Sequence, residues 1–135
     1  MVRKERRRAL REALADLQRY AVTVPRDRFL ADRDVQRQVL HALYVAVQAC
    51  LDEAVEACQA SGIEAGDTYR EAFLALGRAG LLDPALASRL ADWASFRNVL
   101  AHFYPVLDLE RAHGALGEID DLRAFESWLQ GRSPD

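Results

Sequence analysis

The stretch from about residue 27 to residue 60 constrains the fold most, because its apolar side chains recur at steps of three and four residues. The repeating residues are Phe29, Leu30, Val35, Val39, Leu40, Leu43, Val47, Cys50, Leu51, Ala54, Val55 and Cys58. Such spacing places these side chains along one side of an α-helix, whereas a half-buried strand would alternate at every second residue. The stretch therefore predicts a long, strongly apolar helix whose apolar side packs against other helices.

Four further segments carry helical signals. They cover about residues 3–22, 68–80, 83–104 and 108–130. Thr68 and Glu71 form a capping-box pair at the start of one helix. Asp83 can cap the next, and Pro84 suits its first helical position. Pro105 ends that helix, because the residue before a proline avoids the helical region. Together with the long helix, these segments predict an all-α, antiparallel bundle of about five helices.

Length and composition agree with this fold. The 135 residues fit one domain over residues 1–135, and the hydrophobic fraction of 50% is enough for a core. Glycine and proline are few, which favours helices. No apolar run reaches the roughly 18–20 residues that a membrane span needs, and the charged N-terminus lacks the apolar core of a signal peptide. We therefore expect a soluble, cytoplasmic protein without a membrane partner.

Charge is distributed unevenly along the chain. Residues 1–11 hold six basic groups and one acidic group, a local sum of +5, so the rest must sum to −8 to give the net −3. A chain with this balance does not attract RNA through its overall field, so any RNA contact must be local. The basic helical arm at residues 1–22 could be a solvated face, touch RNA, or pack beside the acidic C-terminal helix. We prefer packing to RNA contact; the acidic residues of that helix are Glu118, Asp120, Asp121 and Glu126.

The cysteines and histidines predict neither a disulfide nor a metal site. Cys50 and Cys58 are eight residues apart on one predicted helix. That spacing corresponds to about 12 Å, which is beyond the roughly 7 Å limit for bridged Cα atoms. Two cysteines and three scattered histidines do not have the spacing of zinc ligands. We expect two buried, inert thiols, no metal and no cofactor.

The helix predicted over residues 83–104 has two contrasting sides. One side is apolar and predicts core packing; it carries Trp93, Phe96, Val99, Leu100 and Phe103. The other side is small or polar; it carries Ala91, Ala94, Ser95, Asn98, Ala101 and His102. Small side chains permit close approach of another backbone. We therefore expect this side to contact another segment, for example the same helix of a second subunit across a two-fold axis.

A polar cluster lies at the end of the same helix. Arg97, Asn98, His102 and Tyr104 fall within eight positions, directly before Pro105. On an ideal helix Arg97 and His102 would be about 140° apart. A helix distorted before the proline, or a dimer that brings both copies into one cleft, would bring them together. The residues alone leave open whether this is a chemical site or a polar interface.

The cluster resembles a known motif. The spacing of Arg97, His102 and Tyr104 resembles the R-x4-H-x-Y motif of the HepT-like toxins, a branch of the HEPN superfamily. The stretches "DRFLADRDVQRQVLHAL", "YREAF" and "FRNVLAH" also occur in an order similar to that family. The resemblance covers about residues 26–130. It implies a homodimeric HEPN-type helical bundle whose two motifs face each other in a cleft.

The resemblance also implies an activity. HEPN enzymes of this kind are metal-independent endoribonucleases, in which the ribose 2′-hydroxyl attacks the neighbouring phosphate and leaves a cyclic phosphate end. His102 would act as general base or acid. Arg97 would bind the phosphate oxygens and the charge that grows in the transition state. Asn98 would orient the histidine or the phosphate. Both tRNA and mRNA are among the implied substrates.

The same resemblance gives Tyr104 a separate role. It would be the tyrosine to which a cognate minimal nucleotidyltransferase antitoxin adds AMP groups, whose phosphates would repel RNA and occupy the arginines. Two other functions stay open. One is a catalytically silent HEPN binding module that docks a nucleotidyltransferase or a nucleotide, and the other is a purely structural helical dimer. His41 and His113 are interpreted as surface or packing residues.

Overall fold

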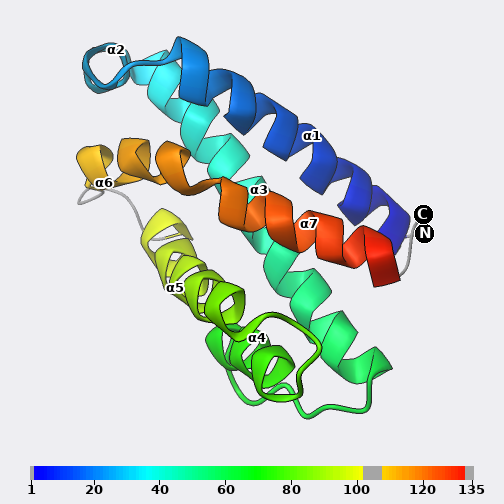
Figure 1. The fold of residues 1–135 in the computed structure, drawn as a ribbon. Coiled ribbons are helices and arrows are strands. Elements are labelled where there is room, and N and C mark those ends of the chain that lie inside the picture. Colours follow the sequence, from blue (N-terminus) through cyan, green and yellow to red (C-terminus); the bar gives the residue numbers. More distant parts are fainter. Residues whose placement is uncertain (1, 102–107, 133–135) are drawn as a thin grey trace.

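The computed structural model describes residues 2–101 and 108–132, and every regular element within them is a helix (Figure 1). The elements are α1 (Val2–Thr23), α2 (Arg26–Ala31), α3 (Arg33–Ala60), α4 (Tyr69–Arg78), α5 (Pro84–Ala101), α6 (Leu109–Gly114), the 3₁₀ helix η1 (Ala115–Glu118) and α7 (Asp120–Arg132). The prediction of an all-α chain is thereby confirmed. In these described ranges, no helix combines the length and the hydropathy needed to cross a membrane.

Two of the five predicted segments are interrupted. The long segment divides at Asp32, which has an extended backbone and accepts hydrogen bonds from the N–H groups of Asp34 and Val35. The aspartate therefore caps a new helix, and α2 precedes α3 as a separate short helix. The last segment similarly divides into α6, η1 and α7. The apolar spacing continues through both interruptions, which is why the sequence pattern reads each as one helix.

Helix α3 provides the common packing surface of the bundle. It contacts α1, α2, α4, α5 and α7, and in Figure 1 it runs behind α1 and α7. The fully buried side chains include Phe29, Phe73 and Phe125, and the last two pack edge to face with ring centroids 5.3 Å apart. Burying each such ring contributes about 1.5–3 kcal/mol. This core fixes the positions of α4 and α5, which carry the candidate site.

Small residues bring α5 close to α4 within the same chain. Ala87, Ala91 and Ala94 follow one another at helical spacing and are all buried. A Cβ atom built on Gly77 of α4 would lie only 2.8 Å from the Cβ of Ala87, so the two helices approach closely. The small side of α5 therefore does contact another segment, as expected, but over this stretch the segment is α4 rather than a second subunit. Further along the same side, Ser95 is exposed.

The basic arm forms α1, which packs on α3 and beside α7 (Figure 1). Three of its arginines, Arg3, Arg6 and Arg7, pair with α3. Arg7 donates from Nε to Glu53 at 2.7 Å, and Arg6 donates to both Glu53 and Glu56. Packing beside the C-terminal helix was thus predicted correctly, but the charged partners were not. Glu53 and Glu56 are three residues apart on the side of α3 that faces α1, which puts their carboxylates within reach of these arginines.

The two thiols are buried and unpaired, as predicted. Burial raises the pKa of the Cys50 thiol far above its ordinary value, and the charges of Glu53 and Glu126 raise it further. Burial also raises the pKa of Cys58, partly opposed by the charge of Arg132. Because the thiolate is the reactive form, neither cysteine has the character of a nucleophile.

Candidate functional site

The last turns of α5 carry two of the four residues singled out in the sequence. Arg97 is half-buried and Asn98 is exposed. His102 and Tyr104, like Phe103, lie outside the described residues. On the apolar side of α5, Trp93, Phe96 and Leu100 are buried as predicted, whereas Val99 is only half-buried. The site is therefore built here around Arg97 and Asn98, with α5 fixed by its apolar side.

Neutral groups surround the Arg97 guanidinium. Its Nε donates to Oε1 of Gln48 at 2.9 Å, and its Nη1 donates to Oδ1 of Asn98 at 3.3 Å. Its Cζ lies 5.8 Å from the ring centroid of Tyr69, within the range of a cation–π contact. In the described part of the chain, Arg97 forms no ion pair with a carboxylate. Among the described residues, its positive charge is therefore held in place without a carboxylate in direct contact.

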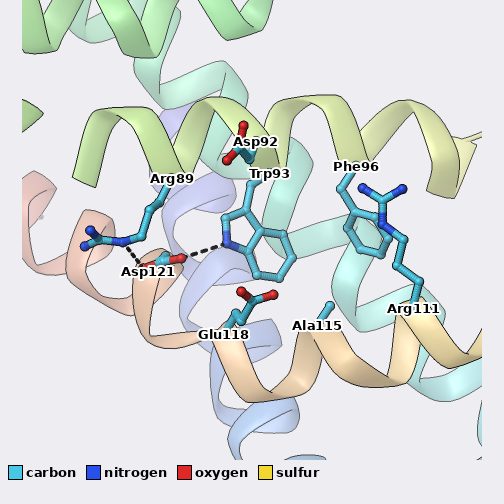
Figure 2. Close-up of a pocket in the computed structure, with 8 residues that line it drawn as sticks. All are labelled: Arg89, Asp92, Trp93, Phe96, Arg111, Ala115, Glu118 and Asp121. Atoms are coloured by element: carbon cyan, nitrogen blue, oxygen red, sulfur yellow. Dashed lines mark hydrogen bonds and ion pairs between the residues drawn. The ribbon is translucent and has the colours of Figure 1, made fainter. Parts of the chain in front are cut away.

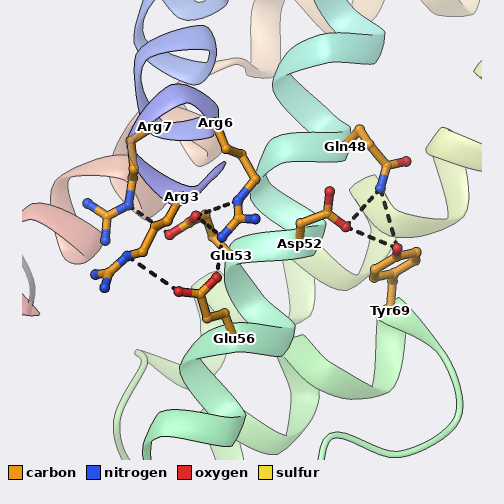
Figure 3. A network of polar contacts seen from close by, with 8 residues as sticks. All are labelled: Arg3, Arg6, Arg7, Gln48, Asp52, Glu53, Glu56 and Tyr69. Atoms are coloured by element: carbon orange, nitrogen blue, oxygen red, sulfur yellow. Dashed lines mark hydrogen bonds and ion pairs between the residues drawn. The ribbon is translucent and has the colours of Figure 1, made fainter. Parts of the chain in front are cut away.

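The groups that hold Arg97 are themselves connected (Figure 3). Gln48 donates from Nε2 to Oδ1 of Asp52 at 3.1 Å and to the Tyr69 hydroxyl at 3.4 Å. The same Oδ1 accepts the hydroxyl hydrogen bond of Tyr69 at 3.1 Å. One network thus links α3, α4 and α5. Sequence reasoning missed Gln48, Asp52 and Tyr69, and the available signal was a pair of polar residues four apart within the strongly apolar helix.

A groove lies beside this network, between the start of α4 and the end of α5. It has a volume of about 330 Å³ and is lined by Thr68, Tyr69, Arg70, Ala94, Ser95 and Asn98. Arg70 is paired with Asp92 at 3.1 Å and lies 3.5 Å from the hydroxyl of Ser95. A polar groove next to an unneutralised arginine can accept a phosphate-bearing ligand.

A second pocket, of about 150 Å³, lies on another side of α5, against α6, η1 and α7 (Figure 2). Asp121 accepts from Arg89 Nε at 2.8 Å and from the indole of Trp93 at 3.3 Å. Arg111 lies over the ring of Phe96, with its Cζ 5.4 Å from the centroid. These contacts join α5 to the C-terminal helices. Trp93 and Phe96, which contact Asp121 and Arg111, are largely apolar side chains. We interpret this pocket as part of the packing that orients α5.

Among the described residues, no metal-binding arrangement accompanies the site. Within residues 2–101 and 108–132, no group of three or more histidine, cysteine, aspartate or glutamate side chains is placed to hold a metal ion. His41 is exposed on α3, and His113 is half-buried with Nε2 2.7 Å from the carbonyl oxygen of Val24. The two histidines are a surface and a packing residue respectively, as interpreted from the sequence.

Solved structures with the same fold include toxin–antitoxin complexes. One is a tri-AMPylated HEPN toxin of Shewanella oneidensis in complex with MNT antitoxin, with a TM-score of 0.83, 19% identity, and coverage of 96% of this chain and 97% of that chain. Another is a tyrosine-to-alanine mutant of the toxin–antitoxin MntA–HpeT, with a TM-score of 0.83, 18% identity, and coverage of 97% and 99%. A third is a toxin–antitoxin with AMP-PNP, with a TM-score of 0.83 and 18% identity over 96% and 98% of the two chains.

Sequence comparison gives the family. Among curated proteins, no match to this chain was found. The family model described as ribonuclease HepT-like matches residues 10–127, which include α5, the whole network around Arg97 and the motif positions His102 and Tyr104. Because the match spans most of the 135 residues, the resemblance noted in the sequence is confirmed. The chain belongs to the HepT-like ribonuclease family.

Proposed function

We propose that this protein is the toxin of a HEPN/MNT toxin–antitoxin pair and acts as a metal-independent endoribonuclease on tRNA or mRNA. The family supports a ribonuclease in general terms. The observation that carries the proposal for this chain is Arg97, whose guanidinium is oriented by Gln48 and Asn98 and has no carboxylate partner in the described residues. An arginine in this state can bind a phosphodiester and stabilise the charge of its transition state.

The proposed reaction uses residues of two copies of the chain. His102 of one copy takes the proton of the ribose 2′-hydroxyl, and the 2′-oxygen forms a bond to the adjacent phosphorus. The bond from phosphorus to the 5′-oxygen breaks, and His102 of the second copy gives that oxygen a proton. The products are a 2′,3′-cyclic phosphate and a 5′-hydroxyl. Arg97 binds the phosphate oxygens, and Asn98, which already contacts Arg97, orients the phosphate or the histidine.

Tyr104 is the proposed site of neutralisation. A cognate minimal nucleotidyltransferase would transfer AMP groups to its hydroxyl, as the tri-AMPylated state of the Shewanella toxin suggests by analogy. Tyr104 follows Arg97 by seven positions, so attached phosphates would add negative charge near the guanidinium. They would compete with the RNA backbone for the arginine and repel it.

The proposal is tested by cleavage of total tRNA and a model mRNA in EDTA. Wild type would be compared with His102→Ala and with His41→Ala, which removes an exposed histidine from α3 as a matched control. Intact mass would first establish that Tyr104 is unmodified, and light scattering would give the oligomeric state. We expect His102→Ala to lose at least about 10²-fold in rate, while His41→Ala cleaves normally and both remain dimers.

Two results would contradict the proposal. Equal cleavage by wild type and His102→Ala would remove the histidine from the mechanism. Absence of cleavage by an unmodified wild-type dimer would instead favour a silent module that docks a nucleotidyltransferase. Docking of a nucleotidyltransferase is supported by the solved structures with the same fold, which include toxin–antitoxin complexes.

A further inference from the structure

We infer that Gln48 and Asp52 are positioning residues for Arg97, and that the Gln48 amide separates Asp52 from Arg97 so that the guanidinium is oriented without being neutralised. This inference rests on the proposed function, because it explains how the candidate phosphate-binding arginine keeps its charge. It is built from three contacts: Arg97 to Gln48, Gln48 to Asp52, and Tyr69 to Asp52.

Elementary hydrogen-bond chemistry fixes the direction of the Gln48 amide. The Nε of Arg97 can only donate, and an ionised Asp52 carboxylate can only accept. Gln48 lies between them, so its oxygen must face Arg97 and its nitrogen must face Asp52. The distances of 2.9 Å and 3.1 Å agree with this direction. Asp52 therefore determines which end of the amide meets Arg97.

Tyr69 ties the same network to α4. Its hydroxyl donates to the Asp52 oxygen that also accepts from Gln48, and its ring lies against the Arg97 guanidinium. Tyr69 thus contacts both ends of the relay. Since α4 packs closely on α5, the ring position and the arginine position are set together.

The Gln48 amide differs from a carboxylate at the same position in its charge, and this difference affects phosphate binding by Arg97. Both accept a hydrogen bond from Nε, but a carboxylate would also form an ion pair and share the positive charge. It would then compete with a phosphate for the arginine and repel the incoming anion. In the neighbouring groove Arg70 is in that paired state with Asp92, whereas the acceptors that Arg97 meets among the described residues are neutral.

The test exchanges the two side chains of the relay. In the double variant Gln48→Glu/Asp52→Asn, Glu accepts from Arg97 and Asn donates to Glu while accepting from Tyr69. The hydrogen bonds from Arg97 to position 48, between positions 48 and 52, and from Tyr69 to position 52 therefore each keep a donor and an acceptor, and the net charge is unchanged. The longer contact from Gln48 to the Tyr69 hydroxyl, at 3.4 Å, loses its donor. The main difference is that the carboxylate moves next to the guanidinium. The matched control is Asp34→Asn/Gln38→Glu, which moves a carboxylate by the same one turn along the exposed start of α3.

We expect the exchange variant to unfold at the same temperature as wild type or slightly above it, and to lose about 10²-fold in kcat/KM for RNA. The control should keep wild-type activity. Cleavage by the exchange variant at the rate of the control would overturn the inference. If the network had a merely structural role, the exchange variant would lose activity only in proportion to its loss of stability.

A third variant separates charge from orientation. Gln48→Met removes the acceptor without adding charge, and we expect a loss of about 10-fold. The predicted order of activity is wild type, then Gln48→Met, then the exchange variant. If the exchange variant cleaves faster than Gln48→Met, orientation alone matters and the charge-sparing role is wrong. The cleavage rates are divided by the concentration of folded protein. The predicted order can therefore be tested even if one of the variants folds poorly.

Failure of the inference is distinguishable from failure of the proposed function. If unmodified wild type does not cleave RNA, the proposed function fails, and affinity for a short 2′-O-methylated RNA becomes the readout. About tenfold weaker binding by the exchange variant than by the control would support the charge-sparing relay for phosphate binding. Equal binding by the two variants would overturn it.

Discussion

Asp52 and Glu53 are neighbours in the sequence, but they take part in two different networks on α3 (Figure 3). Glu53 faces α1, is 2% exposed, and accepts directly from Arg7. Asp52 faces α4 and α5 and accepts from Tyr69 and Gln48, so that it reaches Arg97 only through the amide. The comparison shows how one helix can hold arginines in two ways, one that neutralises the charge and one that leaves it available.

The network on the α1 side has the features of a structural ion-pair cluster. Arg7 is 1% exposed, and its Nη1 has no hydrogen-bond partner among the described residues, so its charge depends on Glu53. Burial lowers the pKa of Arg6, but hydrogen bonds to Glu56 and Glu53 outweigh this and raise it above its ordinary value. Both arginines are therefore committed to acidic residues of α3. Their ion pairs join the basic arm, which forms α1, to the rest of the bundle.

The largest expected effect comes from breaking this buried cluster. Glu53→Gln removes the charge that compensates Arg7, and leaving one partner of a buried pair uncompensated costs about 3–5 kcal/mol. We expect a loss of that size in the free energy of unfolding, measured by urea denaturation. Glu56→Gln is the control, because its side chain is 40% exposed and should cost less than about 1 kcal/mol.

A double variant sharpens the same point. Arg7→Met/Glu53→Leu removes both charges, and replacing a buried ion pair by apolar residues is often neutral. We expect most of the stability lost in Glu53→Gln to return. If Glu53→Gln lowers the free energy of unfolding no more than Glu56→Gln does, the network on the α1 side is not the structural ion-pair cluster described above.

A smaller effect on stability is expected on the other side. Tyr69→Phe removes the hydroxyl that donates to Asp52 and accepts the longer hydrogen bond from Gln48, and it keeps the ring. The free energy of unfolding should fall by about 0.5–1.5 kcal/mol. Because the relay loses a support, RNA cleavage should fall by up to about 10-fold, which corresponds to about 1.4 kcal/mol. Tyr44→Phe, at an exposed position of α3, provides the control. An unchanged cleavage rate in Tyr69→Phe would place this tyrosine outside the functional network.

The sequence predicts the fold well because helical spacing is a local property. The segment over residues 3–22 corresponds closely to α1, and the described part of the segment over residues 83–104 corresponds to α5. The predicted end of that segment, directly before Pro105, lies outside the described residues. The interruption at Asp32 was missed, although an aspartate that caps the following helix is a recognisable start signal. The apolar spacing continues across Asp32, so the sequence predicted one helix where the structure has α2 and α3.

The candidate site was predictable only where it is local. Arg97 and Asn98 belong to a short motif, whereas Gln48 lies 49 residues before Arg97 and meets it only after α3 and α5 pack. The charge partners of the arm were wrong for the same reason, since net charge does not say which acidic residues a helix will face. The role of Tyr104 and that of His102 stay predictions, because both lie outside the described residues.

The most direct test of this account is the RNA cleavage rate per folded molecule, measured side by side for Asp52→Asn and Glu53→Gln. Both variants replace a carboxylate by its amide at adjacent positions of α3. We predict that Asp52→Asn cleaves about 10-fold more slowly than wild type, because the direction of the Gln48 amide is no longer fixed. Glu53→Gln should cleave at the wild-type rate once its lower folded fraction is taken into account. Equal rates for the two variants, or a loss confined to Glu53→Gln, would contradict the division of α3 into a structural and a functional side.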